Sequence, residues 1–424
     1  MVIRLSRRVF LALLCVCTNI ARPSFAQTAA TQTDTLTIAE ANRLALANNP
    51  MLHAAEFSAQ AAQQRIGPAG ALPDPQLQFG LMNRMASDLG STSDPMTMNQ
   101  VQLMQMLPFP GKVGRARDAV RHQAAAAGAD VVEQRRMLIA QVEEAYSMLA
   151  YTDRALGAMG RTQGQLRDFA EVATTMYAVG SGLQQDVLRA QVEVARMGEN
   201  ITNMQQDRVV GAARLNTLLG REAMAPVGAL ELPTDTLPLP SLDSLVALAL
   251  QNRAALQAGA ERVAAADAAL SAARRELLPD FQVGIAYHQR SAFPNMVSLM
   301  VGVSLPVFAG SRQLPARREM AAMQQMTSAE QLSLRNETTA QVIETRARAE
   351  RDRDLGRLYR NEILPQARAA VQSALAGYRV GKVNYMTLID NQMTVTRYEI
   401  ETYRLQADYQ QAKATLVALT GGLP

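Results

Sequence analysis

Thioether and imidazole side chains are the groups in this sequence whose chemistry could bind a soft metal ion. Six methionines crowd residues 82–106, and thioether ligands suit Cu(I). Because they are scattered over both faces of the strands expected there, and only three histidines could assist them, we expect no metal site. The methionines are Met82, Met85, Met96, Met98, Met104 and Met106, and the histidines are His53, His122 and His288.

Nothing else in the sequence predicts catalysis. Both cysteines, Cys15 and Cys17, fall within an expected export signal, so the mature chain has no thiolate that could act as a nucleophile or metal ligand. The HExxH, GxSxG, Walker and dinucleotide-binding motifs are also absent. We therefore expect a protein that is not an enzyme and that needs no cofactor.

The first 26 residues are typical of a cleaved signal peptide. Three arginines precede an apolar stretch over residues 9–16, and Ser24 and Ala26 supply the small residues of a cleavage site. The whole chain has 42 Lys and Arg against 38 Asp and Glu, but four of the arginines lie in residues 1–26. The mature chain is therefore neutral, with 38 residues of each sign, which argues against a nucleic-acid partner.

The mature chain contains two copies of one unit. The segment Tyr177–Gly180 recurs as Tyr378–Gly381, and Leu72–Asp74 recurs as Leu278–Asp280. Further matches follow in the same order, which indicates a duplication. We expect the first copy at residues 27–221, a proline-rich linker at residues 222–241 and the second copy at residues 242–424.

Within each copy the hydrophobic periodicity alternates between helix and strand. Residues 36–66 predict a helix. Two pairs of short segments then alternate apolar and polar residues with a period of two, as strands of a transmembrane β-barrel do. A half-buried strand of a soluble sheet shows the same alternation. The expected strands are about 75–85, 98–107, 280–290 and 296–306, and the expected long helices are about 112–176, 183–220, 312–379 and 384–420, with a kink at Pro365.

Both kinds of element need neighbours from other chains. Four strands cannot close a membrane barrel, since the smallest has eight, whereas three chains would supply twelve. A helix of about 65 residues cannot bury its own apolar positions. No run of 18 apolar residues occurs, so a chain of this kind would enter a bilayer as a barrel. We therefore expect a homotrimer with lipid on the outer face of its strands.

Six ordered motifs give the sequence its resemblance to a known family. It resembles the TolC family of outer-membrane efflux proteins from about residue 36 to residue 421. The resemblance implies a trimer whose 12-stranded outer-membrane barrel continues into a periplasmic α-helical barrel of coiled coils. The motifs are ALANNP (45–50), LPDP (72–75), LPFPGK (107–112), YAVGSGLQQDVLRAQVE (177–193), LPVFAGSR (305–312) and YRVGKVNYMTLIDNQ (378–392).

The resemblance also implies a function and partners. Such channels are passive exit ducts that dock a periplasmic adaptor (membrane fusion) protein and an inner-membrane pump, here expected to be of the RND type. LPFPGK further resembles the heavy-metal (CusC/CzcC-like) branch, so we expect metal cations or small toxic compounds as substrates. Drug efflux and type I protein secretion use the same fold and remain alternatives. A secreted helical structural protein that forms no pore is a more distant one.

The resemblance places a gate at the periplasmic tips of the helices. Alignment on Tyr-x-x-Gly makes Asp390 the candidate constriction ring, with Tyr378, Asp186 and Thr387 beside it. Three carboxylates in one ring would favour cations. From the residues alone, Asp390 could instead pair on the helix surface and Asp186 could cap a helix. Val383 and Thr387 stand where the family carries arginine and aspartate. The residues expected to contact the adaptor are Gly180, Ser181, Gly182, Gly381 and Lys382.

Overall fold

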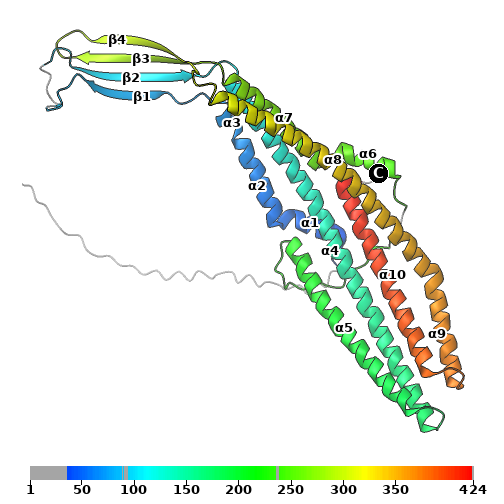
Figure 1. The fold of residues 1–424 in the computed structure, drawn as a ribbon. Helices are drawn as coiled ribbons and strands as arrows, with labels where there is room; N and C mark the ends of the chain where they lie inside the picture. The colour runs from blue at the N-terminus through cyan, green and yellow to red at the C-terminus, as the bar shows by residue number, and fades with distance from the viewer. Residues whose placement is uncertain (1–35, 88, 90–93, 235–237, 423–424) are drawn as a thin grey trace, which may run out of the picture. The chain divides into compact units, whose positions relative to one another are not determined.

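The computed structural model describes residues 36–87, 89, 94–234 and 238–422, and the expected signal peptide lies outside them. These residues form long helices and a small sheet (Figure 1). In the first copy the elements are α1 (Ile38–Asn48), α2 (Pro50–Gln64), α3 (Ile66–Ala69), β1 (Gln76–Met82), β2 (Met98–Leu107), α4 (Lys112–Ala178) and α5 (Gln184–Leu218). In the second they are α6 (Leu242–Asn252), α7 (Ala254–Arg275), β3 (Asp280–Arg290), β4 (Met296–Ser304), α8 (Gln313–Leu358), the π-helical turn η1 (Tyr359–Ile363), α9 (Leu364–Arg379) and α10 (Tyr385–Thr420).

The expectation of one helix over residues 36–66 is wrong, because the chain breaks at Asn49 and Pro50. The side-chain oxygen of Asn49 accepts hydrogen bonds from the backbone N–H groups of Met51 and Leu52, at 3.0 and 3.1 Å. Pro50 then occupies the first position of α2, where its missing N–H costs no helical hydrogen bond. Asn49 and Pro50 therefore end α1 and begin α2.

The α4 helix is the spine of the chain. Its 67 residues span about 100 Å, and it packs against α5, α7 and α10. Nine of its buried residues are alanines, whose small side chains let neighbouring helices approach closely. Two apolar clusters result, one around Val142 and Leu149 and one around Leu166 and Phe169 toward its C-terminal end.

Pro365 disturbs the corresponding run of the second copy. Because proline has no N–H to donate, the α-helical ladder is interrupted one turn before it. The chain passes through the π-helical turn η1 between α8 and α9, with Pro365 in the first turn of α9. The helix therefore continues past the proline with a local change of pitch.

The linker between the copies is packed along the helices. Leu230 and Leu232 are buried, and the backbone N–H of Leu230 donates to Asp153 of α4 at 3.1 Å. The guanidinium group of Arg208 on α5 binds both Asp153, at 2.6 Å, and the carbonyl oxygen of Val227, at 3.2 Å. The prolines exclude helix, and these hydrogen bonds hold the extended chain in place.

The four strands form one antiparallel sheet in the order β1-β2-β3-β4. The central pair, β2 with β3, joins the two copies, with Val101 opposite Tyr287 and Leu103 opposite Ile285. Its ladders run without a bulge, so residues of one parity share one face across all four strands. Among the described residues, no helix is both long enough and apolar enough to cross a membrane.

Candidate functional site

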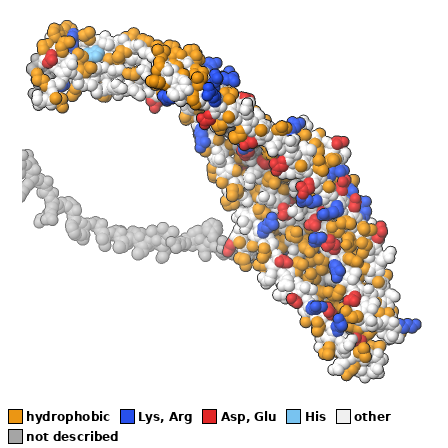
Figure 2. Space-filling view, in the orientation of Figure 1, with side chains coloured by type: hydrophobic (Ala, Val, Ile, Leu, Met, Phe, Trp, Pro, Cys, Tyr) orange, Lys and Arg blue, Asp and Glu red, His pale blue; other side chains and the backbone are white. Residues whose placement is uncertain are grey.

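One face of the sheet is apolar and exposed in the single chain. Leu77, Leu103, Ile285 and Leu299 form one row across the strands. Leu299 is 74% exposed although it is a large hydrocarbon side chain. Figure 2 shows hydrophobic side chains over both the sheet and the helices, whereas most of the charged side chains lie over the helices. A contiguous exposed apolar face marks an interaction with lipid or protein.

The opposite face is polar and carries methionine. Gln78, Gln102 and Ser298 lie on it in one row with Ala286. The expectation that the methionines are scattered over both faces is wrong, because those within strands all lie on this polar face. Met85 and Met96 lie outside the strands, and the others of the first hairpin are Met82, Met98, Met104 and Met106.

Both edges of the sheet are open in the single chain. Within the described residues, β1 pairs only with β2 and β4 pairs only with β3. Each outer strand therefore presents a row of backbone N–H and C=O groups to a further strand. An exposed apolar face with two open edges is incomplete as a monomeric sheet.

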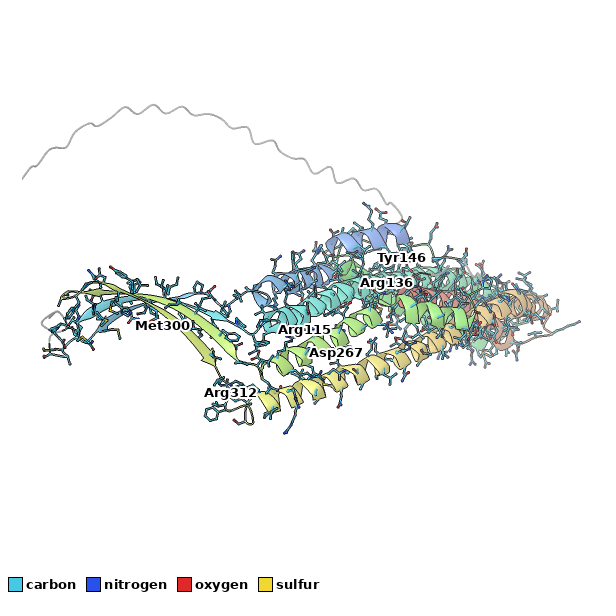
Figure 3. The ribbon with its side chains drawn as sticks, turned by 90° about the horizontal axis from the view of Figure 1, so that it is seen from above. Arg115, Arg136, Tyr146, Asp267, Met300 and Arg312 are labelled. Carbon is cyan, nitrogen blue, oxygen red and sulfur yellow. The ribbon has the colours of Figure 1, made fainter. Side chains whose placement is uncertain are left out.

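A buried lysine ties the sheet to the spine helix. Lys112, at the start of α4, is 6% exposed, and its ammonium group lies 2.8 Å from Asp280 of β3 and 3.5 Å from Glu276. The same Asp280 carboxylate accepts the backbone N–H of Phe109 at 2.9 Å. Figure 3 shows Arg115 on α4 and Arg312, just before α8, near this end of the sheet. These contacts join the start of α4 to the start of β3.

The two helical hairpins end in matching turns. Gly180 and Gly381 adopt φ angles of +75° and +70°, which L side chains rarely adopt. The backbone N–H of Ser181 donates to the carbonyl oxygen of Met176, and that of Lys382 to Gly377, both at 2.9 Å. This is the Schellman hydrogen bond that ends a helix. Gly182 is also constrained, because a Cβ there would lie 2.9 Å from the backbone nitrogen of Tyr177.

Beside these turns, two predicted gate residues from different copies meet. The hydroxyl group of Tyr378 on α9 donates a long hydrogen bond of 3.5 Å to Asp186 on α5. Tyr378 is 5% exposed, and burial, followed by the charge of Asp186, raises the pKa of its hydroxyl group. The buried ring of Tyr385 packs edge-on against Tyr378 at 5.4 Å and its pKa is raised as well, mainly by burial. The contact lies within one chain.

The structure places the other predicted gate residues apart from this contact. Asp390 is exposed on α10. Thr387 is part of a helix cap, because its backbone N–H and its hydroxyl group both lie 2.8 Å from the side-chain oxygen of Asn384. Val383 packs against Gly377, because a Cβ added at Gly377 would lie 2.6 Å from the Cγ2 atom of Val383. An apolar contact therefore occupies a position where the family carries a charged side chain.

A polar ladder between α4 and α10 was not predicted from the sequence. The hydroxyl groups of Thr162 and Thr396 lie 2.8 Å apart and are buried, and the amide of Gln392 donates to Gln165 at 2.7 Å. Arg161 binds Glu399 at 2.6 Å beside them, next to a cavity of about 240 Å³. Single threonines and glutamines on long helices carry no periodic signal, so only the packed structure reveals these pairs.

The described residues contain no group of three or more histidine, cysteine, aspartate or glutamate side chains that could hold a metal ion. The turns, the Tyr378–Asp186 contact and the two-faced sheet are therefore the features from which a function has to be built.

Comparisons with known proteins agree on one family. The family model described as outer membrane efflux protein matches residues 42–221 and 245–422. The chain is 26% identical over 412 residues to the pyoverdine export outer membrane protein OpmQ of Pseudomonas putida, covering 88% of this chain and 83% of that protein. It is 24% identical over 394 residues to the cobalt-zinc-cadmium resistance protein CzcC of Cupriavidus metallidurans, covering 91% and 90%.

Solved structures give the same fold. A structure of CusC, described for its conformational changes on folding and transmembrane channel formation, superposes with a TM-score of 0.81 at 18% identity and covers 92% of this chain and 93% of CusC. The outer-membrane channel OprN superposes with a TM-score of 0.77 at 20% identity and covers 92% and 91%.

Proposed function

Because this chain belongs to the outer membrane efflux protein family, we propose that three copies of it form the passive exit duct of a tripartite efflux system. The observation that carries the proposal is the sheet, which has one exposed apolar face, one polar face and two open edges. Pairing β4 of each subunit with β1 of the next subunit closes a barrel of twelve strands and leaves no strand edge in the lipid. The apolar face then contacts lipid and the polar face lines the water-filled pore.

The helices complete the same assembly below the membrane. Two faces of the helical layer expose apolar side chains in the single chain: Leu188 and Val210 on α5, and Ile343 and Leu358 on α8. Packing α5 of one subunit beside the α8–α9 run of the next subunit would bury both sets of apolar side chains in a periplasmic helical barrel. The sheet has two open edges and the helical layer has two exposed apolar faces, so each needs a neighbouring subunit on both sides. One trimer satisfies both needs with the same two neighbours.

The gate belongs to the tips of this helical barrel. The Asp390 side chains of the three subunits would form a ring of carboxylates that favours cations. The Tyr378–Asp186 contact would hold the α9–α10 hairpin against the α4–α5 hairpin. The exposed turns would contact the periplasmic adaptor through Gly180, Ser181, Gly182, Gly381 and Lys382. Thr387 and Val383 leave the gate with few polar contacts, so a partly open resting pore is expected.

The transported substrates are metal cations or small toxic compounds that an inner-membrane pump of the RND type delivers. One relative is a cobalt-zinc-cadmium resistance protein, and another exports pyoverdine. A duct of this kind acts as a passive passage, so we infer that the chain takes no part in catalysis.

Assembly and conductance test the proposal together. Protein purified in mild detergent should have three times the mature chain mass by light scattering, and it should conduct ions after insertion into a planar bilayer. A monomer with intact helical circular dichroism would contradict the closure argument. A trimer that stays monodisperse without detergent would show that the apolar face does not contact lipid.

A further inference from the structure

Methionine and hydrocarbon side chains are segregated between the two faces of the sheet. The polar face of the four strands carries six methionines and no valine, leucine, isoleucine or phenylalanine. The apolar face carries those residues and no methionine. Parity assigns the faces, because every paired position joins residues of the same parity. The six are Met82, Met98, Met104, Met106, Met296 and Met300.

Hydrophobicity alone does not account for this segregation. Leucine and methionine bury comparable apolar area, so a requirement for apolar surface alone would have allowed both residues on either face. What methionine adds is a polarizable sulfur on a flexible stem, which is a ligand for soft metal ions. The thioethers lie where the remaining neighbours are glutamine, serine and glycine, on the face that would meet water.

The clearest pair of thioethers meets over Gly284. In the register Met104 of β2 and Met300 of β4 flank this glycine of β3 on either side. A Cβ at position 284 would lie 3.8 Å from Cγ of Met104 and 3.5 Å from Cε of Met300, so both side chains reach the same space above the glycine. Met300 lies at the middle of the sheet (Figure 3). The missing side chain makes room for the pair.

Two further pairs of soft donors follow along the strands. Met82 stands directly opposite Met98, and Met296 stands directly opposite His288. The Nε2 atom of His288 lies 3.1 Å from the hydroxyl oxygen of Ser298, while its Nδ1 atom is buried and has no hydrogen-bond partner among the described residues. An unpartnered imidazole nitrogen beside a thioether is a second candidate ligand set.

We propose that the polar face of the sheet binds a soft monovalent cation, Ag(I) or Cu(I), through paired thioethers, with Met104 and Met300 as the principal pair. The face offers little to harder ions, because Asp280 is its only carboxylate and Lys112 neutralises it. That this face lines the pore rests on the proposed function. The thioether pairs would then give the cation successive weak sites along the barrel wall, which lets it enter and leave.

Silver titration of the purified full chain in detergent tests the site, using silver nitrate in a chloride-free buffer. Met104→Leu with Met300→Leu keeps the apolar volume and removes both sulfur atoms. This double variant should bind Ag(I) at least about tenfold more weakly than the parent protein. The matched control is Met323→Leu with Met326→Leu on α8, whose side chains are 46% and 49% exposed. The control should bind as the parent does.

X-ray absorption at the silver edge gives a second readout that does not depend on stability. The parent protein should show sulfur neighbours of silver, and the Met104→Leu, Met300→Leu variant should lose part of that signal while its circular dichroism stays unchanged. Equal silver affinity in parent and variant would overturn the proposal. So would a variant that binds silver normally yet loses affinity for an apolar dye, because the methionines would then serve an organic substrate.

Bilayer conductance measured without silver separates this inference from the proposed function. A variant that conducts as the parent does but loses silver binding supports the site. A parent that binds silver through sulfur but neither trimerises nor conducts would refute the duct and leave the thioether site standing. A conducting parent without sulfur-bound silver would refute the site alone.

Discussion

Charge placed on one face of β4 or on the other should have opposite consequences. Leu299 lies on the apolar face in the row with Leu77, Leu103 and Ile285, whereas its neighbour Ser298 lies on the polar face. We expect Leu299→Arg to prevent assembly in the membrane, because a guanidinium group there would meet hydrocarbon. Ser298→Arg should be tolerated, because its side chain would extend into water.

The position of Leu299 sets the size of the effect. It is the fourth of nine residues in β4, so it lies close to the middle of the strand. An arginine facing lipid at the bilayer midplane of a β-barrel costs about 2–4 kcal/mol, and the cost falls to about 0–1 kcal/mol near the interfaces. Central placement predicts the upper range, and three copies in the trimer would each carry the penalty.

Urea titration of folded protein in lipid bilayers would measure the difference. The Leu299→Arg protein should lose about 2–4 kcal/mol of unfolding free energy per chain and yield little trimer in outer membranes. Gln78→Arg, in the row of Ser298, is a second polar-face control. Equal losses on the two faces would refute the assignment of lipid and lumen, and with it the closure of the barrel.

Three further substitutions test the helices. Tyr378→Phe removes the 3.5 Å hydrogen bond to Asp186, worth about 0.5 kcal/mol at this length, and should raise single-channel conductance; unchanged conductance would show that the contact does not restrain the pore. Asp390→Ala should reduce cation selectivity and block by multivalent cations in planar bilayers, and unchanged selectivity would place the ring elsewhere. Burial, and then the charge of Asp352, raises the pKa of Asp408 above its ordinary value of 3.8. Between the pKa of the unfolded chain and the higher pKa of the folded chain, the folded chain holds a proton that the unfolded chain has released. The stability of the fold therefore falls as pH rises from the lower pKa to the higher one. Asp408→Asn should therefore raise the melting temperature at pH 7 but not below about pH 3.8, and a gain that persists in acid would argue against titration as its cause.

The faces of the sheet could be predicted from the sequence because a strand has a period of two and these ladders contain no bulge. Leu299 and Ser298 are neighbours in sequence and must point to opposite sides. The same parity would have placed the methionines on one face. Counting Met85, which has the opposite parity but lies outside the strands, concealed the segregation.

The tip contacts could not be predicted in the same way. Tyr378 and Asp186 are 192 positions apart, and their contact depends on how α9 packs against α5. The resemblance to the family named both residues, but only the packed structure shows that the hydrogen bond joins the two hairpins of one chain. Asn49 and Pro50 are the opposite case, since their helix break follows from local chemistry that the sequence already contains.

The distribution of polar contacts between α4 and α10 locates where the tips could separate. Gln165–Gln392 is a short hydrogen bond, and the Thr162–Thr396 pair above it is both short and buried. Nearer the turns, the polar link that the described residues show between the two hairpins is the long Tyr378–Asp186 contact, and Val383 packs where the family carries a charged residue. Because breaking a buried hydrogen-bonded pair costs more than breaking a long one, separation should stop at Gln165 and Gln392. Gln165 precedes the end of α4 by about 20 Å of helix, so the movable part is a short tip on a fixed barrel.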